Sequence, residues 1–169
     1  MKIVIFKGGL GNQLFQYNLY CRLKELGYKV RALNFCQNSH NGFEVTKYFG
    51  VDIKFSHKIM QWLFFKLCNL PTKIKSNFII DETNFHEDKM ALYFNDYWQD
   101  KRYFPLKNNV QFRKMTLNES NENILELINT TNSVSIHIRR GDYLIGGNTN
   151  VFVNLSETNY YKESINRIY

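Results

Sequence analysis

The N-terminal segment constrains the fold more than any other part of the sequence, because it predicts a strand, a glycine-rich turn, a helix and a second strand. Residues 3–6 form a short apolar run typical of a buried parallel strand. Four apolar side chains then recur at helical spacing on one face: Phe15, Leu19, Leu23 and Leu26. Gly27 marks the end of this helix, and residues 28–33 predict the second strand. Because strands joined by a helix pair in parallel, we expect an α/β fold with a helix-covered parallel sheet.

The middle of the chain gives weaker predictions. Residues 44–49 and 59–69 are typical of helices, and the apolar run 59–70 is too short to span a bilayer. We interpret that run as a core helix, with a membrane-surface helix as the less favoured alternative. Residues 72–110 contain many aromatic side chains without a clear period, so we expect loops and short helices there.

Regular patterns return towards the C-terminus. Residues 122–128 predict a helix, and residues 133–138 alternate as a strand does. Ser156 is a candidate N-cap for a last helix, since its hydroxyl can accept from the free N–H groups of the first turn. No glycine or proline follows before Tyr169, so we expect the helix to continue to the last residue.

The chain is basic, with a formal net charge of +7. Such a surface attracts nucleic acid, acidic lipid head groups or a nucleotide diphosphate, and charge alone does not choose among them. The three cysteines, Cys21, Cys36 and Cys68, are far apart in sequence, which disfavours a disulfide framework and a CxxC zinc site. Reduced thiols, and an N-terminal apolar run too short for a signal peptide, indicate a cytosolic protein.

Residues 7–13, with the sequence KGGLGNQ, form the first candidate site. Glycines let backbone N–H groups approach a ligand, and the start of the following helix favours phosphate or the edge of a sugar. A plain tight turn is the alternative. Leu14 replaces the third glycine of a dinucleotide-binding loop, and residues 33–35 lack its acid, so NAD binding is disfavoured. The Gly-Lys-Ser/Thr of a P-loop is absent as well.

Residues 135–143, with the sequence SIHIRRGDY, form the second candidate site. Side chains alternate along a strand, so His137 and Arg139 share one face, and Arg140 follows where Gly141 breaks the strand. An arginine fork can hold two phosphate oxygens, and two arginines at a strand end favour an anion clamp. The alternative is an arginine pair bridged to Asp142 and to surface acids.

Together these segments resemble glycosyltransferase family 11, the α-1,2-fucosyltransferases. The matching stretches are GGLGNQLFQY at 8–17, HNGFEVTKYFG at 40–50, YFNDYWQDKRYF at 93–104 and SIHIRRGDY at 135–143. The segment after Ser156, with Tyr160, Tyr161 and Lys162, fits the family as well. The combination of GGLGNQ with HIRRGDY is far more specific than either motif alone.

The resemblance implies a GT-B fold, in which two Rossmann-like lobes face each other across a cleft. Residues 1–125 would form the acceptor-side lobe, and residues 126–169 the start of an incomplete donor-binding lobe. Family members continue well beyond this length. We therefore expect a truncated chain that is inactive by itself.

The resemblance also implies an activity: inverting transfer of L-fucose from GDP-fucose to the 2-hydroxyl of a galactoside, in glycan or O-antigen synthesis, with no metal or other cofactor. Arg139 would hold the donor diphosphate with support from Arg140, while His137 and Asp142 line the same pocket. Gly9, Gly11 and Asn12 would form the facing loop. The implied partners are GDP-fucose and a galactose-terminated glycan, and the implied location is the cytoplasm, with peripheral contact to the inner membrane as an option.

The chemistry agrees with these residue types. The leaving group is GDP, so preorganised arginines stabilise the charge that develops on its phosphate oxygens. The Asp-x-Asp sequence with which many sugar transferases hold a metal is absent. Asp142 is one candidate general base, although its arginine neighbours weaken it, and Glu44 and Asp96 remain alternatives. A non-catalytic polyanion-binding protein is the rival hypothesis, but the chain lacks a nucleic-acid-binding signature.

Overall fold

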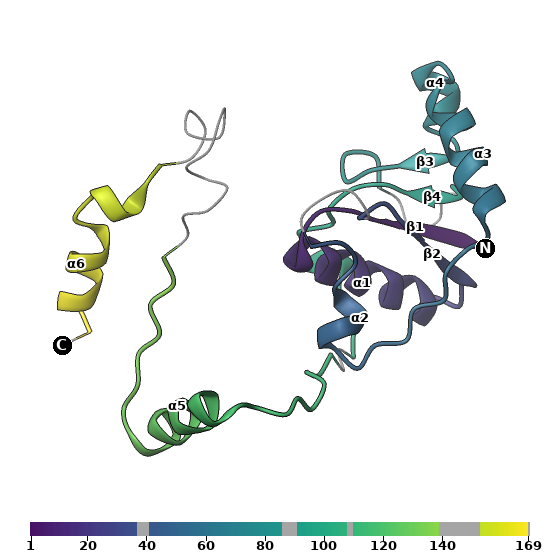
Figure 1. The fold of residues 1–169 in the computed structure, drawn as a ribbon. Helices are drawn as coiled ribbons and strands as arrows, with labels where there is room; N and C mark the ends of the chain where they lie inside the picture. The colour runs from purple at the N-terminus through teal and green to yellow at the C-terminus, as the bar shows by residue number, and fades with distance from the viewer. Residues whose placement is uncertain (37–40, 86–90, 108–109, 139–152, 169) are drawn as a thin grey trace. The chain divides into compact units, whose positions relative to one another are not determined.

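A computed structural model of the chain describes residues 1–36, 41–85, 91–107, 110–138 and 153–168 (Figure 1). The chain divides into two compact units, Met1–Met115 and Thr116–Tyr169. The expected lobes at residues 1–125 and 126–169, and their GT-B arrangement, stay predictions.

The first unit is built on a four-stranded parallel sheet in the order β2-β1-β4-β3. The strands are β1 (Lys2–Phe6), β2 (Val30–Asn34), β3 (Ile79–Ile80) and β4 (Tyr93–Phe94). Helix α1 (Leu10–Glu25) connects β1 to β2 (Figure 1). Ile3 pairs with Arg31 on one side and with Tyr93 on the other, so β1 lies inside the sheet. The predicted α/β fold with a Rossmann-like parallel sheet is confirmed.

Side chains of β1 alternate between two apolar clusters, one on each face of the sheet. Val4 and Phe6 pack in the cluster that contains Leu19 and Leu23 of α1. Ile3 and Ile5 belong to the opposite cluster, which contains Phe64 of helix α3 (Lys58–Cys68). All of β1 is buried because helices cover both faces, which explains its continuous apolar run.

The buried face of α1 differs in part from the predicted apolar stripe. Leu19 and Leu23 are fully buried, but Phe15 is only half-buried and Leu26 is exposed. Two glutamines, Gln13 and Gln16, are fully buried on the same helix instead. The helix ends as predicted, with Gly27 at a φ of +84°, in the left-handed region that favours glycine.

The segment between β2 and the end of this unit contains short elements. The helices are α2 (Val45–Tyr48), α3, α4 (Thr72–Lys75) and the 3₁₀ turn η1 (Lys101–Tyr103). Strands β3 and β4 lie within residues 72–110, where we expected loops and short helices, so that prediction is wrong in part. Two-residue strands buried on both faces carry no period, and their pairing with β1 defines them.

The prediction of a core helix at residues 59–70 holds for one face only. Phe64 of α3 is buried, whereas Ile59, Trp62 and Phe65 are at least half exposed. Within the described residues, no helix combines the length and the apolar character needed to cross a membrane.

The second unit begins with helix α5 (Glu119–Thr130), capped by Asn118, whose side chain accepts from the N–H of Asn121. Residues 133–138 do not form the predicted strand. Alternation alone does not make a strand, because a strand needs a paired neighbour. The described residues of this unit contain no strand.

The last helix also differs from the prediction. Ser156 lies inside a 3₁₀ turn, η4 (Leu155–Glu157), whose N-cap is Asn154; the Asn154 side chain accepts from both the N–H and the hydroxyl of Ser156. The helix, α6 (Tyr160–Asn166), begins four residues later and ends before the last residue. Both bounds of the predicted helix are therefore corrected.

Candidate functional site

The glycine loop of the first motif connects β1 to α1, and its glycines have different structural demands. Gly8 has a φ of +78°, and a Cβ added there would lie 2.7 Å from the Asn12 side-chain nitrogen. Gly9 is the extended N-cap of α1 and provides no side-chain cap. Gly11 lies exposed in the first turn, with no atom within 4 Å of an added Cβ. The backbone therefore requires glycine at Gly8, whereas Gly11 keeps an open surface.

Gln13 fixes this loop to a second one through its buried amide. Its nitrogen donates to the carbonyl oxygens of Gly8 and Gly42, both at 2.9 Å. Its oxygen accepts from the backbone N–H groups of Glu44, at 2.8 Å, and Val45, at 3.1 Å. One side chain thus satisfies four backbone groups and ties the GGLGNQ loop to the start of α2.

Gln16 connects the same loop to the segment that follows β4. Its oxygen accepts from the N–H of Lys7 at 3.0 Å, and its nitrogen donates to the carbonyls of Lys7, at 3.1 Å, and Asp96, at 3.3 Å. Because both glutamines are fully buried and saturated with backbone partners, they hold the loop rather than a ligand.

Polar groups from the loops after β1 and β4 meet at the carboxyl edge of the sheet. The Lys7 ammonium donates to the Asn95 side-chain oxygen at 3.1 Å and lies 4.9 Å from the ring centre of Tyr97. The Asn12 side-chain oxygen accepts from the Gln99 side chain at 2.6 Å. A half-buried cation, amide groups and an exposed aromatic ring suit the hydroxyl groups and faces of a sugar.

The position of this cluster agrees with its chemistry. The connection through α1 places β2 on one side of β1, whereas β4 pairs on the other side. The boundary between the paired strands β1 and β4 is thus the topological switch point, where the chain connections turn to opposite sides. Open parallel sheets bind ligands outside the carboxyl ends of their strands at such a point.

A small polar pocket of about 180 Å³ lies nearby and shares Asn95 with the cluster. Its lining comes from α3, α4 and the ends of β3 and β4: Cys68, Thr72, Lys75, Ser76, Ile79, Asp81, Asn84 and Asn95. Burial raises the pKa of the Cys68 thiol, while the charge of Lys75 acts in the opposite direction. Since a raised pKa keeps this thiol protonated near neutral pH, the pocket is suited to hydrogen bonding rather than to thiolate chemistry.

Glu44 and Asp96, the two alternative general bases, differ in what surrounds their carboxyl groups. Glu44 is buried at the N-terminus of α2. Both carboxylate oxygens of Asp96 accept from backbone N–H groups, those of Glu82 at 3.1 Å and Tyr97 at 2.8 Å. Asp96 therefore orders the loop after β4, next to the Lys7 cluster, and the backbone N–H of Glu44 donates to Gln13.

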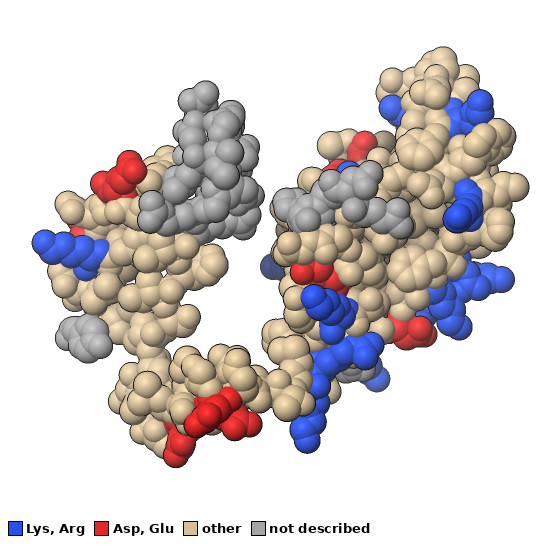
Figure 2. Space-filling model, in the orientation of Figure 1, with Lys and Arg blue, Asp and Glu red and all other residues tan. Residues whose placement is uncertain are grey.

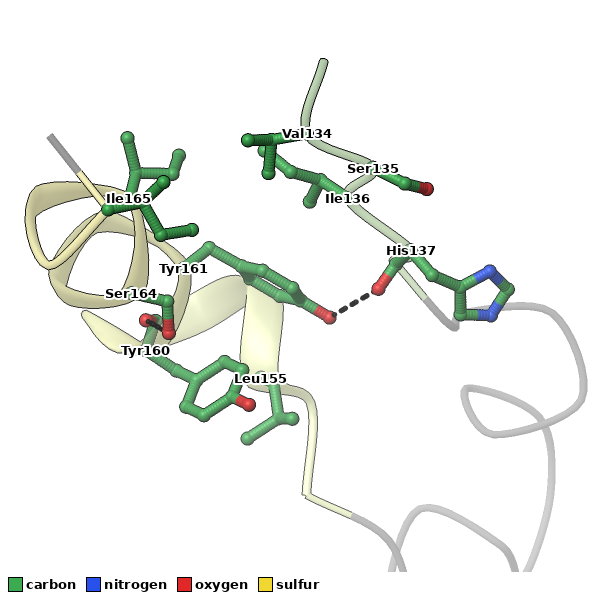
Figure 3. Close-up of a pocket in the computed structure, with 10 residues that line it drawn as sticks. Val134, Ser135, Ile136, His137, Leu155, Tyr160, Tyr161, Ser164 and Ile165 are labelled. Carbon is green, nitrogen blue, oxygen red and sulfur yellow. Dashed lines mark hydrogen bonds between the residues drawn. The ribbon is translucent and has the colours of Figure 1, made fainter. Parts of the chain in front are cut away.

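His137 is the one predicted residue of the second motif that the structure describes. Its side chain is exposed, and its carbonyl oxygen accepts from the Tyr161 hydroxyl at 3.2 Å (Figure 3). A pocket of about 390 Å³ lies between residues 134–137 and the α6 region. Its lining is Val134, Ser135, Ile136, His137, Leu155, Tyr160, Tyr161, Ser164, Ile165 and Ile168.

This pocket does not have the chemistry of a diphosphate clamp. Its described walls are mainly apolar and aromatic and contain neither lysine nor arginine. In Figure 3 the His137 imidazole points away from Tyr161 and Ile165. Arg139, Arg140 and Asp142 lie outside the described residues, so the predicted clamp stays a prediction. Among the described residues, no group of three His, Cys, Asp or Glu side chains is placed to hold a metal ion.

Comparison with known proteins decides the family. The sequence profile of glycosyl transferase family 11 matches residues 1–169. The chain belongs to glycosyltransferase family 11. An alpha-1,2-colitosyltransferase from Escherichia coli is 30% identical over 193 aligned positions, which cover 98% of this chain. The chain spans 63% of the length of that relative. No solved structure matches the chain.

Within this family 11 chain, the sequence pattern identified the loop but not the residues that hold it. Gly9, Gly11 and Asn12 were predicted, whereas the role of Gly8 and the amide contacts of Gln13 and Gln16 were missed. Their spacing provided a signal, since both glutamines lie on the same helical face as the buried leucines. Lys7 lay within the predicted loop, but its contact with Asn95 was missed because Asn95 comes from a distant part of the sequence.

Proposed function

We propose that the enzyme to which this chain contributes transfers L-fucose from GDP-fucose to the 2-hydroxyl of a galactoside, with inversion at the sugar carbon. The observation that carries the proposal is the match of the family 11 profile over all 169 residues. The glycine loop at the switch point of the sheet supports it, because this is where a parallel α/β sheet binds its ligand.

The choice of sugar is the finer part of the proposal. The E. coli relative is named for colitose, which differs from fucose in lacking one hydroxyl group. Both are deoxyhexoses, so the coarser activity, transfer of a deoxyhexose, is common to both. A site that hydrogen-bonds the extra hydroxyl rejects the sugar without it strongly, whereas an apolar site discriminates weakly. We propose fucose on the resemblance of the motifs.

Arg139 and Arg140 carry the donor side of the mechanism. As the bond between the sugar and GDP breaks, negative charge develops on the diphosphate oxygens. Paired guanidinium groups stabilise this charge more in the transition state than in the ground state. They fill the role that a metal has in enzymes with an Asp-x-Asp sequence, which this chain lacks.

The cluster around Lys7 supports an acceptor role for the first unit. Lys7, Asn95 and Tyr97 lie beside the exposed start of α1, where Gly11 leaves room for a sugar to approach the backbone. Amide groups and an aromatic ring provide donors, acceptors and a stacking face for a galactoside. Asp142, Asp96 and Glu44 stay the candidates for the general base; Asp96 is in the same loop as Asn95 and Tyr97, with both carboxylate oxygens accepting from backbone N–H groups.

The test uses a hybrid protein, in which this chain is followed by the C-terminal part of a family 11 α-1,2-fucosyltransferase. GDP-fucose and lactose are supplied in excess EDTA, and the product linkage is determined by NMR. We expect 2-linked fucosyl-galactose at an undiminished rate in EDTA. Release of GDP without a fucosylated product overturns the transferase assignment, and dependence on added magnesium or manganese overturns the arginine mechanism. Transfer from GDP-colitose in preference to GDP-fucose overturns the choice of sugar.

A further inference from the structure

The outward surface of α3, α4 and the residues around them exposes more apolar area than the fold requires. Its large apolar side chains are Ile59, Trp62, Phe65, Leu70, Ile74 and Phe78, which we call the α3–α4 face. Ile59 is 62% exposed and Trp62 is 59% exposed. Single exposed apolar residues are common, but a group gathered on consecutive helices marks an interaction surface.

The packing of α3 on the sheet keeps this face turned outward. Phe64, on the inner side, packs with Tyr93 of β4 at a ring-centre distance of 5.2 Å. The Tyr93 hydroxyl donates to the carbonyl of Met60 at 2.8 Å and fixes the helix rotation. Rotation of α3 to bury Trp62 would expose Phe64 and break this hydrogen bond. The exposure of Trp62 is therefore a consequence of how the core is built.

The charged side chains of the segment that carries this face are all lysines, although Asp81 follows it directly and lines the pocket with Lys75. Residues 53–80 contain the lysines Lys54, Lys58, Lys66, Lys73 and Lys75 and no aspartate or glutamate. Figure 2 shows Lys and Arg atoms, and no Asp or Glu atoms, over α3 and α4 in that view. The Lys66 ammonium lies 5.5 Å from the ring centre of Trp62, so aromatic and cationic groups are interleaved. Lysine stems can cover apolar surface while their ammonium groups stay in water.

We propose that the α3–α4 face binds the surface of an anionic lipid bilayer. Tryptophan and phenylalanine insert favourably at the level of the head groups, and lysines are attracted to acidic lipids. A second copy of the chain docked on the same face would place these lysines against one another. The aliphatic Ile59, Leu70 and Ile74 offer nothing to a nucleic acid. The proposal is independent of the transferase activity.

Helix α5 provides a natural comparison. It also exposes apolar side chains, among them Ile124 and Leu127, at 52% and 60%. Its charges, however, are Glu119, Glu122 and Glu126, and it contains no lysine or arginine. An acidic lipid surface repels such a helix, so exposed apolar area alone does not define the proposed site.

The experiment is flotation of the 169-residue protein with vesicles in a density gradient, which leaves aggregated protein at the bottom. We expect flotation with vesicles of phosphatidylglycerol and phosphatidylethanolamine, little with pure phosphatidylcholine, and loss of binding at high salt. Tryptophan emission should shift to the blue with the anionic vesicles. The shift should vanish in Trp62→Ala, since Trp98 is fully buried.

Matched variants separate the contribution of the aromatic side chains to membrane binding from that of the lysines. Trp62→Ala with Phe65→Ala should weaken partitioning by about tenfold or more. Lys58→Gln with Lys73→Gln should weaken it by roughly fivefold for each lysine. Ile124→Ala with Leu127→Ala, on α5, should leave binding unchanged.

Three results overturn the proposal. The first is equal binding to phosphatidylcholine, and the second is binding that neither the aromatic pair nor the lysine pair affects. The third is a dimer, seen by sedimentation velocity without vesicles, that Trp62→Ala with Phe65→Ala dissociates. If the aromatic variant fails to fold, the lysine pair decides alone, because both of its side chains are exposed.

Discussion

At the scale of single residues, Gln13 has the largest share in shaping the candidate site. Gln13→Leu keeps the volume of the side chain but leaves a buried carbonyl, a part-buried carbonyl and two buried N–H groups without their partner. Each such loss costs about 1–3 kcal/mol, so we expect the free energy of unfolding to fall by about 3 kcal/mol or more. Urea unfolding followed by tryptophan fluorescence measures the first unit, which contains both tryptophans.

The matched control is Gln99→Leu. Gln99 is exposed, and among the described residues its side chain donates to Asn12 alone, so the change should stay within about 0.5 kcal/mol. Equal effects of the two variants would show that the amide of Gln13 does not hold the loop.

The glycines of the same loop separate a backbone requirement from a ligand contact. Gly8→Ala combines a positive φ with a Cβ 2.7 Å from the Asn12 amide, so we expect a loss of about 2 kcal/mol or more. Gly11→Ala removes a glycine from a helix and meets no atom within 4 Å, so stability should stay equal or rise by up to about 1 kcal/mol. Thermal unfolding measures both.

The activity of the hybrid enzyme then tests the role of Gly11. If a sugar approaches the backbone there, Gly11→Ala lowers the transfer rate of a fully folded enzyme. Full activity in Gly11→Ala would remove this residue from the site.

Cys36 makes the stability of the chain depend on pH above neutrality. Burial raises the pKa of its thiol from 9.0 to about 11. The folded state therefore holds a proton that the unfolded state releases, so stability is complete below pH 9 and falls towards pH 11. The loss amounts to at most about 3 kcal/mol. Urea unfolding across this range should show a smaller fall for Cys36→Ala than for the wild type, and parallel curves would contradict the assignment.

At the scale of elements, the sequence predicted the long helices and strands of the first unit but not its two-residue strands. The βαβ order, the glycine after α1 and helix α3 were predictable because each extends over enough residues to show a period or a stop signal. Strands β3 and β4 were not predictable, since two residues carry no period and their pairing depends on β1. The Lys7–Asn95 contact joins residues that only the folded sheet brings together.

For residues 133–138 the prediction failed in the opposite way, because the sequence alternates as a strand does but the segment forms no strand. We expect their amide hydrogens to exchange quickly in the 169-residue protein, whereas those of β1 are protected. In the hybrid enzyme the segment should gain protection if a partner strand is supplied. Hydrogen exchange followed by mass spectrometry measures both, and slow exchange of residues 133–138 in the shorter protein would contradict this interpretation.

At the scale of the whole molecule, the two units differ in how complete they are. The first has apolar clusters on both faces of its sheet, whereas the second has no buried side chain among its described residues. Its exposed apolar residues include Leu127, Val134 and Ile136, so this unit lacks the packing of a finished core. The proposed donor site is on this less complete side, and the chain spans 63% of the length of its E. coli relative.

The central claim is that this family 11 chain binds a nucleotide-sugar diphosphate through Arg139, and calorimetric titration of the hybrid enzyme with GDP tests it most directly. Lysine keeps the charge but loses the planar two-pronged contact, so Arg139→Lys should weaken binding of GDP and GDP-fucose by about ten- to a hundredfold, with EDTA present throughout. Arg102→Lys, at an exposed ion pair with Asp100, is the matched control and should bind normally. Normal GDP binding by Arg139→Lys, together with a lower melting temperature, would instead show that Arg139 is a structural ion-pair partner and would contradict the account.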